Sequence, residues 1–258
     1  QVVFPWFFFT DSSLIGRAIL SLGILGGVSI CFGRFSRRWL IYVWVVLCSL
    51  QARNPLVVHA GDGWLRILVF LAALLPLDRE QLIKVSAGKM NSQLVESPYA
   101  FLVIGQLVLI YFVAGASKLW NGWWDGRGIY NAFHLLIYAK SLAKYIREWP
   151  TEVLSIFNWM ILIMELVISH LLWCSGKWWR FRIIAILVFL IFHLSCLFVL
   201  ELGFLPWVGI IHLLLLFPSQ FWDLLPDWFS VEEQATDLAF SQGQRALISL
   251  VYFLFLSL

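Results

Sequence analysis

Long apolar runs alternate with short polar segments along most of the chain. A helix needs roughly 20 apolar residues to cross a bilayer, and several of the runs approach this length. They predict an all-α fold, a polytopic membrane helix bundle with about seven or eight transmembrane helices. The predicted spans are Leu14–Gly33, Trp39–Leu50, Gly63–Leu77, Tyr99–Ala116, Val153–Cys174, Ile183–Leu202, Phe204–Phe217 and Ala246–Leu258.

The segment between the fourth and fifth spans is too polar to cross a bilayer. It begins with a turn rich in Gly and Trp, Trp120–Arg127, and continues with Ile129–Ile146. In the second part, apolar residues recur near helical spacing, for example at Ile129, Phe133 and Leu136. This pattern predicts an amphipathic helix on the outer face of the membrane. A helix that packs against a partner protein is an equal alternative.

The composition supports a lipid environment. Hydrophobic residues make up 61% of the 258 residues and charged residues only 13%, whereas a soluble domain has about 25% charged residues. The net charge of +3 is small, which argues against nucleic acid as a partner. No group of Cys, His, Asp and Glu has the spacing of a metal site, so we expect no metal. The expected partner is the lipid bilayer, and membrane proteins or peptides are further candidates.

Basic residues in the loops predict the orientation of the chain. Short loops that are rich in Lys and Arg stay in the cytoplasm. If the first six spans alternate in direction, the loops after the first, third and fifth spans share one side, which we predict to be cytoplasmic. The basic residues of these loops are Arg34, Arg37 and Arg38, then Arg79, Lys84 and Lys89, then Lys177, Arg180 and Arg182.

Several ionisable residues lie in or beside the predicted spans, where they are costly and therefore suggest a function. The predicted topology brings His59, Asp62 and Arg66 to the outer side, at the start of the third span. Lys118 ends the fourth span and Glu201 ends the sixth, both on the same side. Together these groups would form one outer-leaflet cavity that transfers protons on an amphiphilic substrate.

Each of these residues also has a purely structural interpretation. Lys118 would extend to the lipid headgroups without any chemistry. Asp62 and Arg66 are four residues apart in the sequence and would form an ion pair on one helix face.

The remaining polar residues of the spans have structural interpretations as well. Glu165, in the middle of the fifth span, would pair with Arg17 and lock two helices together. His193 and His212 would be hydrogen-bonded histidines inside the bundle.

Three stretches carry a further signal when they are taken together. They are Ser49–Arg66 continuing to Leu75-Pro-Leu, then Gln106–Trp120 followed by Trp123-Trp-Asp-Gly, and finally Phe192-His-Leu through Glu201-Leu-Gly-Phe-Leu-Pro-Trp to Phe217-Pro-Ser. In this order and spacing they resemble the HTTM family, the membrane domain shared with vitamin K-dependent gamma-glutamyl carboxylase. The resemblance runs from about Phe7 to Leu225 and implies a single HTTM-like transmembrane domain over residues 1–258.

The resemblance implies roles for individual residues. Lys118 matches the family lysine that deprotonates vitamin K hydroquinone, and His193 matches a histidine in a Phe-His block. Trp123 and Asp125 match the family's Trp-x-(Glu/Asp)-Gly turn. The implied cofactor is a quinone such as reduced vitamin K, and the implied activity is carboxylase- or epoxidase-like. With the groups of the predicted outer-leaflet cavity added, the candidate catalytic residues are Lys118, His193, His59, Asp62 and Glu201, and the candidate cofactor-binding residues are Trp123, Asp125 and Arg66.

Because the chain differs from the carboxylase, the sequence is consistent with two functions. We expect neither the large lumenal domain of the carboxylase nor the first family helix, which would precede Val2–Ser13. The first prediction is a quinone- or lipid-dependent modifying enzyme with a lysine base. The alternative is a non-catalytic accessory subunit of a larger membrane complex, for example a photosynthetic or respiratory one. A transporter ranks last because the sequence has no internal repeat.

Overall fold

The computed structural model describes residues 13–31, 37–53, 58–75, 98–121, 123–218 and 221. All secondary-structure elements assigned within these residues are helices, as the sequence predicts. The chain forms two compact units, one with residues 1–103 and 221–258 and the other with residues 104–220. The last predicted span, Ala246–Leu258, lies outside the described residues.

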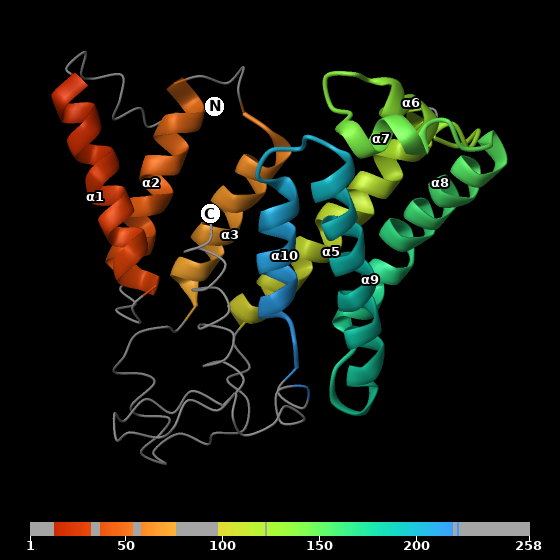
Figure 1. Ribbon diagram of the computed structural model, residues 1–258. Helices are drawn as coiled ribbons and strands as arrows, with labels where there is room; N and C mark the ends of the chain where they lie inside the picture. Colours follow the sequence, from red (N-terminus) through yellow and green to blue (C-terminus); the bar gives the residue numbers. More distant parts are fainter. Residues whose placement is uncertain are drawn as a thin grey trace, which may run out of the picture. The chain divides into compact units, whose positions relative to one another are not determined.

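Three described helices belong to the first unit: α1 (Ser13–Cys31), α2 (Arg37–Arg53) and α3 (Ala60–Leu74). Helices α1 and α2 lie side by side and antiparallel (Figure 1), and Gly26 of α1 allows the Trp39 ring of α2 to approach its backbone. Helix α2 packs in turn on α3, where the ring centroids of Trp44 and Phe70 are 5.1 Å apart. These helices correspond to the first three predicted spans.

The longer helices of the second unit are α5 (Pro98–Trp120, from residue 104 onward), α8 (Thr151–Leu166), α9 (Trp179–Val199) and α10 (Leu205–Leu215). Helices α9 and α10 lie next to each other (Figure 1), with the backbone of Gly209 against the ring of His193. One turn earlier on α9, Phe189 stacks on Tyr111 of α5, with ring centroids 3.8 Å apart. Pro206 lies in the first turn of α10, where its missing N–H breaks no helical hydrogen bond.

The fifth predicted span changes its helix type before its end. Helix α8 ends at Leu166, and the 3₁₀-helix η3 (Ile168–Trp173) follows it. The Ser169 hydroxyl donates to the carbonyl oxygen of Glu165 at 2.7 Å, a local bond that competes with the regular helical ladder. The predicted span Val153–Cys174 is thus helical and apolar up to Trp173, but its last turns are a 3₁₀-helix and not an α-helix. A second short 3₁₀-helix, η4 (Gly176–Trp178), leads into α9.

The prediction of one amphipathic helix over Ile129–Ile146 is wrong. The structure instead has two short helices with a turn between them, α6 (Gly128–His134) and α7 (Ser141–Ile146). The turn pairs with the end of α9, because the Lys140 N–H donates to the Val199 carbonyl at 3.0 Å and the Glu201 N–H donates to the Tyr138 carbonyl at 2.7 Å. Backbone groups that are used in this extended pairing cannot also continue a helix.

Three described stretches are long and apolar enough to cross a membrane: Phe101–Trp120, Thr151–Trp173 and Gly176–Val199. Many of their apolar side chains are exposed on the outside, such as Ile163 on α8 and Ile191 on α9. Contiguous apolar surface of this kind needs lipid or protein around it. The second unit is thus built for a membrane, while the count of seven or eight spans stays a prediction.

We expect Gly209→Ala to destabilise the second unit, since a Cβ at this position would overlap the His193 ring. Overpacking costs about 1–3 kcal/mol of unfolding free energy, so the melting temperature in mild detergent should fall. The matched control is Gly63→Ala in the first turn of α3, where a Cβ would meet open space and where Ala favours the helix by up to about 1 kcal/mol. Equal melting temperatures for the two variants would contradict the close contact of α9 and α10.

Candidate functional site

An ion pair between Lys118 and Glu165 is the centre of the candidate site. Lys118 lies in the last turn of α5, and its Nζ is 2.6 Å from each carboxylate oxygen of Glu165 on α8. The Glu165 side chain is 4% exposed and the Lys118 side chain 22% exposed. A carboxylate buried this deeply needs a cation and hydrogen bonds to offset its desolvation. The two side chains therefore form one ion pair, of which the lysine is the end that reaches the surface.

A glycine permits this close contact between α5 and α8. Gly115 lies one turn before Lys118, and a Cβ there would press against the side chains of Leu166 and Glu165. Helix α5 continues to Trp120, a turn beyond the predicted apolar span, so Lys118 ends this helix as expected. Its position opposite Glu165 is set by the packing of the two helices.

The ring of Trp123 covers the lysine. Lys118 Nζ lies 5.4 Å from the ring centroid of Trp123, within the range of a cation–π interaction. The Asn158 side chain on α8 donates to the Trp123 carbonyl at 2.9 Å, and the backbone of Gly128 packs directly on the indole. The structure thus places Trp123 beside Lys118, and its role in cofactor binding stays a prediction.

Asn158 was missed by the sequence analysis. Its side chain is fully buried, and within the described part of the chain its Oδ1 has no hydrogen-bond partner. Buried amide oxygens without a partner are rare, so this oxygen is available to accept a hydrogen bond. Asn158 and Glu165 are seven residues apart and share one face of α8. Two polar residues at this spacing within an apolar run were the signal that could have found it.

Asp125 shapes the turn that carries Trp123. Its exposed carboxylate accepts a hydrogen bond from the Arg127 N–H at 3.0 Å. Gly126 follows with φ of 79°, a left-handed conformation that favours glycine, and its backbone lies against the Ser155 hydroxyl. Turn geometry accounts for the Asp-Gly sequence, and cofactor binding by Asp125 stays a prediction.

His193 lies deeper in the bundle than the ion pair. Its ring is buried, and its Nε2 is 2.8 Å from the hydroxyl of Tyr111 on α5. Tyr111 precedes Lys118 by seven residues on the same helix face, which corresponds to about 10 Å along the axis. The structural interpretation of His193 as a hydrogen-bonded bundle histidine is thus confirmed. Its partner Tyr111 was missed, although the i,i+7 spacing to Lys118 pointed to it.

Glu201 has a different partner from Glu165. Its carboxylate lies 3.3 Å from the Nζ of Lys140, and its side chain is 65% exposed. Exposed ion pairs of this kind contribute little to stability. Glu201 thus belongs to a surface pair, and no observation joins it to the Lys118–Glu165 pair.

His59, Asp62 and Arg66 belong to the first unit. The Asp62 carboxylate accepts a hydrogen bond from the His59 backbone N–H at 2.8 Å, which is the way an acidic residue caps the start of a helix. Among the described residues no ion pair joins Asp62 to Arg66, so that structural interpretation is wrong. The expected cavity shared by these residues and Lys118 stays a prediction.

The expected partner of Glu165 was also wrong. From the sequence we paired it with Arg17, whereas the structure pairs it with Lys118. Arg17 lies within one predicted span and Lys118 at the end of another, so hydropathy alone could not choose between them. The choice depends on which helices pack together and on how each is rotated.

The exposed apolar helices and the buried ion pair define a membrane protein with a polar site inside its helix bundle. The chain matches the HTTM domain over residues 22–222, which is most of its length. It therefore belongs to the HTTM family, as the three sequence stretches indicated. No curated protein and no solved structure matches the chain.

Removing one member of the ion pair should destabilise the protein more than removing both. Lys118→Met leaves the buried Glu165 carboxylate without its cation, which we expect to cost about 3–5 kcal/mol of unfolding free energy. Lys118→Met combined with Glu165→Leu removes both charges and should recover most of this loss. Thermal unfolding in mild detergent measures the difference.

The matched control for this cycle is Lys177→Met, which removes an exposed lysine from η4. It should leave the melting temperature close to that of the wild type. A double variant that is no more stable than Lys118→Met alone would show that the charge of Glu165 is not what the lysine offsets.

Proposed function

We propose that the chain is a multi-pass membrane enzyme that takes a proton from the hydroxyl group of an amphiphilic substrate. The observation that carries the proposal is the amine of Lys118, the accessible end of an otherwise buried ion pair. Charged groups inside membrane helices are costly and mark functional sites by default. The family resemblance, which implies a lysine base at this position, supports the same conclusion.

The ion pair can accept a proton without leaving a lone buried negative charge. The Lys118 ammonium first passes a proton to the Glu165 carboxylate across the 2.6 Å contact. The neutral amine then takes the proton of the substrate hydroxyl. The products are the Lys118 ammonium, a neutral Glu165 carboxylic acid and the substrate anion. The ammonium lies beside the new anion and stabilises it, and this attraction is strong where water is excluded.

A reduced quinone fits these residues by its chemistry. When bound, such a molecule supplies a weakly acidic aromatic hydroxyl and the electrons for a later oxidation. Lys118 would receive the proton, and the fixed indole of Trp123 offers a flat apolar face beside it. The Oδ1 of Asn158 offers a buried acceptor close to the same tryptophan. We propose a quinone of the vitamin K class as the cofactor on this basis and on the family resemblance.

An accessory subunit is the second candidate function. It is favoured by exposed aromatic side chains next to Lys118, of which Trp120 is 88% exposed and Trp124 is also largely exposed. Exposed aromatic residues are enriched at protein interfaces and at membrane boundaries. In this case the Lys118–Glu165 pair would lock two helices, and the tryptophans would contact a partner subunit.

The enzyme proposal predicts oxidation of a hydroquinone that depends on Lys118. Purified protein in lipid nanodiscs is supplied with vitamin K hydroquinone and air, and the remaining hydroquinone is measured by chromatography. The hydroquinone should be oxidised faster with the protein than without it. Lys118→Met should lower this protein-dependent rate by about 10²–10⁴-fold, the usual contribution of a general base. Glu165→Gln should lower it too, because the amide cannot take the lysine proton.

The control for this assay is again Lys177→Met, which should keep the wild-type rate. Full activity in a folded Lys118→Met variant would eliminate the lysine-base mechanism. Material isolated from the native membrane then separates the two functions. A stoichiometric quinone without a protein partner supports the enzyme, whereas a fixed set of protein subunits without a quinone supports the accessory role.

We also propose an orientation for the second unit. The 3₁₀-helix η4 and the start of α9 carry Lys177, Arg180 and Arg182, and basic residues beside short loops favour the cytoplasmic side. The apolar stretch Gly176–Val199 is long enough to cross the membrane. Helices α6 and α7, at the other end of α9, would then face the outer side, together with the Lys118 end of α5.

Cysteine labelling tests this orientation in sealed right-side-out vesicles. In a background without the native cysteines, Ser141→Cys on α7 should react with a membrane-impermeant maleimide from outside. Ser175→Cys, just before η4, should react only after the vesicles are opened. Both positions are exposed, so a difference in labelling reports sidedness. The reverse pattern would overturn the proposed orientation.

A further inference from the structure

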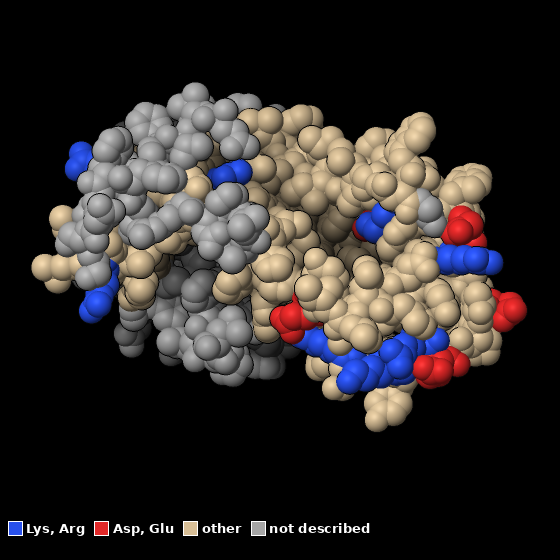
Figure 2. All heavy atoms as spheres, turned by 90° about the horizontal axis from the view of Figure 1, so that it is seen from above, with Lys and Arg blue, Asp and Glu red and all other residues tan. Residues whose placement is uncertain are grey.

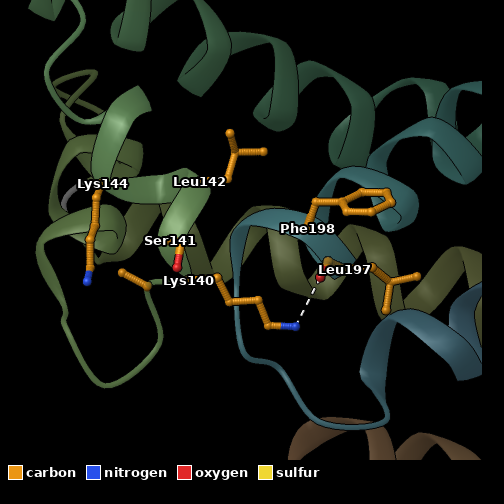
Figure 3. Close-up of a pocket in the computed structure, with 7 residues that line it drawn as sticks. Lys140, Ser141, Leu142, Lys144, Leu197 and Phe198 are labelled. Carbon is orange, nitrogen blue, oxygen red and sulfur yellow. Dashed lines mark hydrogen bonds between the residues drawn. The ribbon is translucent and has the colours of Figure 1, made fainter.

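A shallow hollow lies between α7 and the end of α9. The residues that line it are different from those of the Lys118–Glu165 ion pair. Its volume is about 590 Å³, and Lys140, Ser141, Leu142, Lys144, Leu197 and Phe198 line it (Figure 3). Neither Lys118 nor Glu165 contributes to its lining. The proposed proton transfer therefore leaves this hollow without a role.

Two lysines make the rim of the hollow basic. Lys140 Nζ donates to the Leu197 carbonyl at 3.0 Å, drawn as the dashed line in Figure 3. Lys144 lies one turn further along α7, is exposed, and forms no ion pair with any described residue. Figure 2 shows basic side chains, with acidic ones between them, gathered at the end of the second unit that carries α6 and α7.

One carboxylate offsets part of this positive charge. Glu201 lies 3.3 Å from the Nζ of Lys140, but its side chain is 65% exposed. Exposed ion pairs are weak, so the ammonium of Lys140 can exchange this carboxylate for another anion. Lys144 has no acidic partner among the described residues, so the rim carries more basic than acidic side chains.

The floor of the hollow is apolar and continues along α9. Leu142 and Phe198 border the hollow and are both exposed. Phe198 forms one exposed apolar face of α9 together with Leu194 and Ile191, at helical spacings of four and seven residues. In a membrane protein such a face contacts lipid tails. An amphiphile lying along this face would thus bring its polar head to the two lysines.

We propose that the hollow binds the anionic headgroup of a membrane phospholipid whose tails lie on the exposed face of α9. The lysines attract the phosphate, and the Ser141 hydroxyl adds a neutral donor at the same rim. A zwitterionic lipid carries no net charge to match the rim. Free phosphate has no tails for the apolar face. An anionic phospholipid is the ligand class that uses both halves of the surface.

Lipid titration followed by native mass spectrometry tests the proposal. Purified protein in detergent is titrated with phosphatidylglycerol or phosphatidylcholine, and bound lipid is counted. The wild type should prefer phosphatidylglycerol. Lys140→Gln with Lys144→Gln should weaken that binding about 25-fold, or about fivefold for each lysine. Glu201→Gln should strengthen it, because Lys140 is then free to bind phosphate.

The matched control is Arg147→Gln, at the end of the same short segment. Arg147 is paired with Glu148 at 3.0 Å and does not line the hollow, so its loss should leave the affinity unchanged. Equal weakening in this variant, or no preference between the two lipids, would overturn the proposal. Competition by inorganic phosphate alone would overturn the requirement for lipid tails. A copurified protein that shields Lys144 from amine labelling would assign the surface to a protein partner instead.

Discussion

The second unit depends on the burial of one carboxylate, that of Glu165, among apolar helices. Removing it from water costs several kcal/mol unless a cation lies against it. Lys118 supplies that cation, and it reaches Glu165 because Gly115 lets α5 and α8 approach closely. The contact that holds the two helices together is also the contact across which a proton can move. Stability and the proposed chemistry therefore rest on the same pair of side chains.

A second polar contact fixes the rotation of the helix that carries the lysine. Tyr111, Gly115 and Lys118 share one face of α5, which meets α8 at one level and α9 at another. The hydrogen bond between Tyr111 and His193 holds α5 against α9, and Gly209 allows α10 to close on the same histidine. His193 is hydrogen-bonded about two turns from the ion pair. This geometry supports a positioning role for His193 through the helix, beside the catalytic role that the family resemblance implies.

Local properties of the sequence predicted the helices better than the site. Apolar length and hydropathy are features of a single segment, so α1 and α9 lie close to the predicted spans. Which side chains meet between two helices depends on the rotation of each helix and on the angle at which they cross. Hydropathy specifies neither, so the partner predicted for Glu165 was wrong. The helix predicted over Ile129–Ile146 failed for a related reason. Its apolar periodicity is a local property of the segment, whereas the helix is interrupted by backbone hydrogen bonds to residues 199–201.

The proton site and the basic hollow lie toward the same end of the second unit. Helices α5 and α9 run in the same direction. Early in α5, Gly105 lies beside Trp173, which precedes α9 in the chain, and later in α5, Tyr111 lies beside His193 of α9. Lys118 and Phe198, each near the end of its helix, therefore reach a similar level. A molecule that moves within the bilayer along α9 would arrive at the level where the lysine amine is accessible. This arrangement favours a substrate that enters from lipid over one that enters from water, which agrees with an amphiphile as the partner of Lys118.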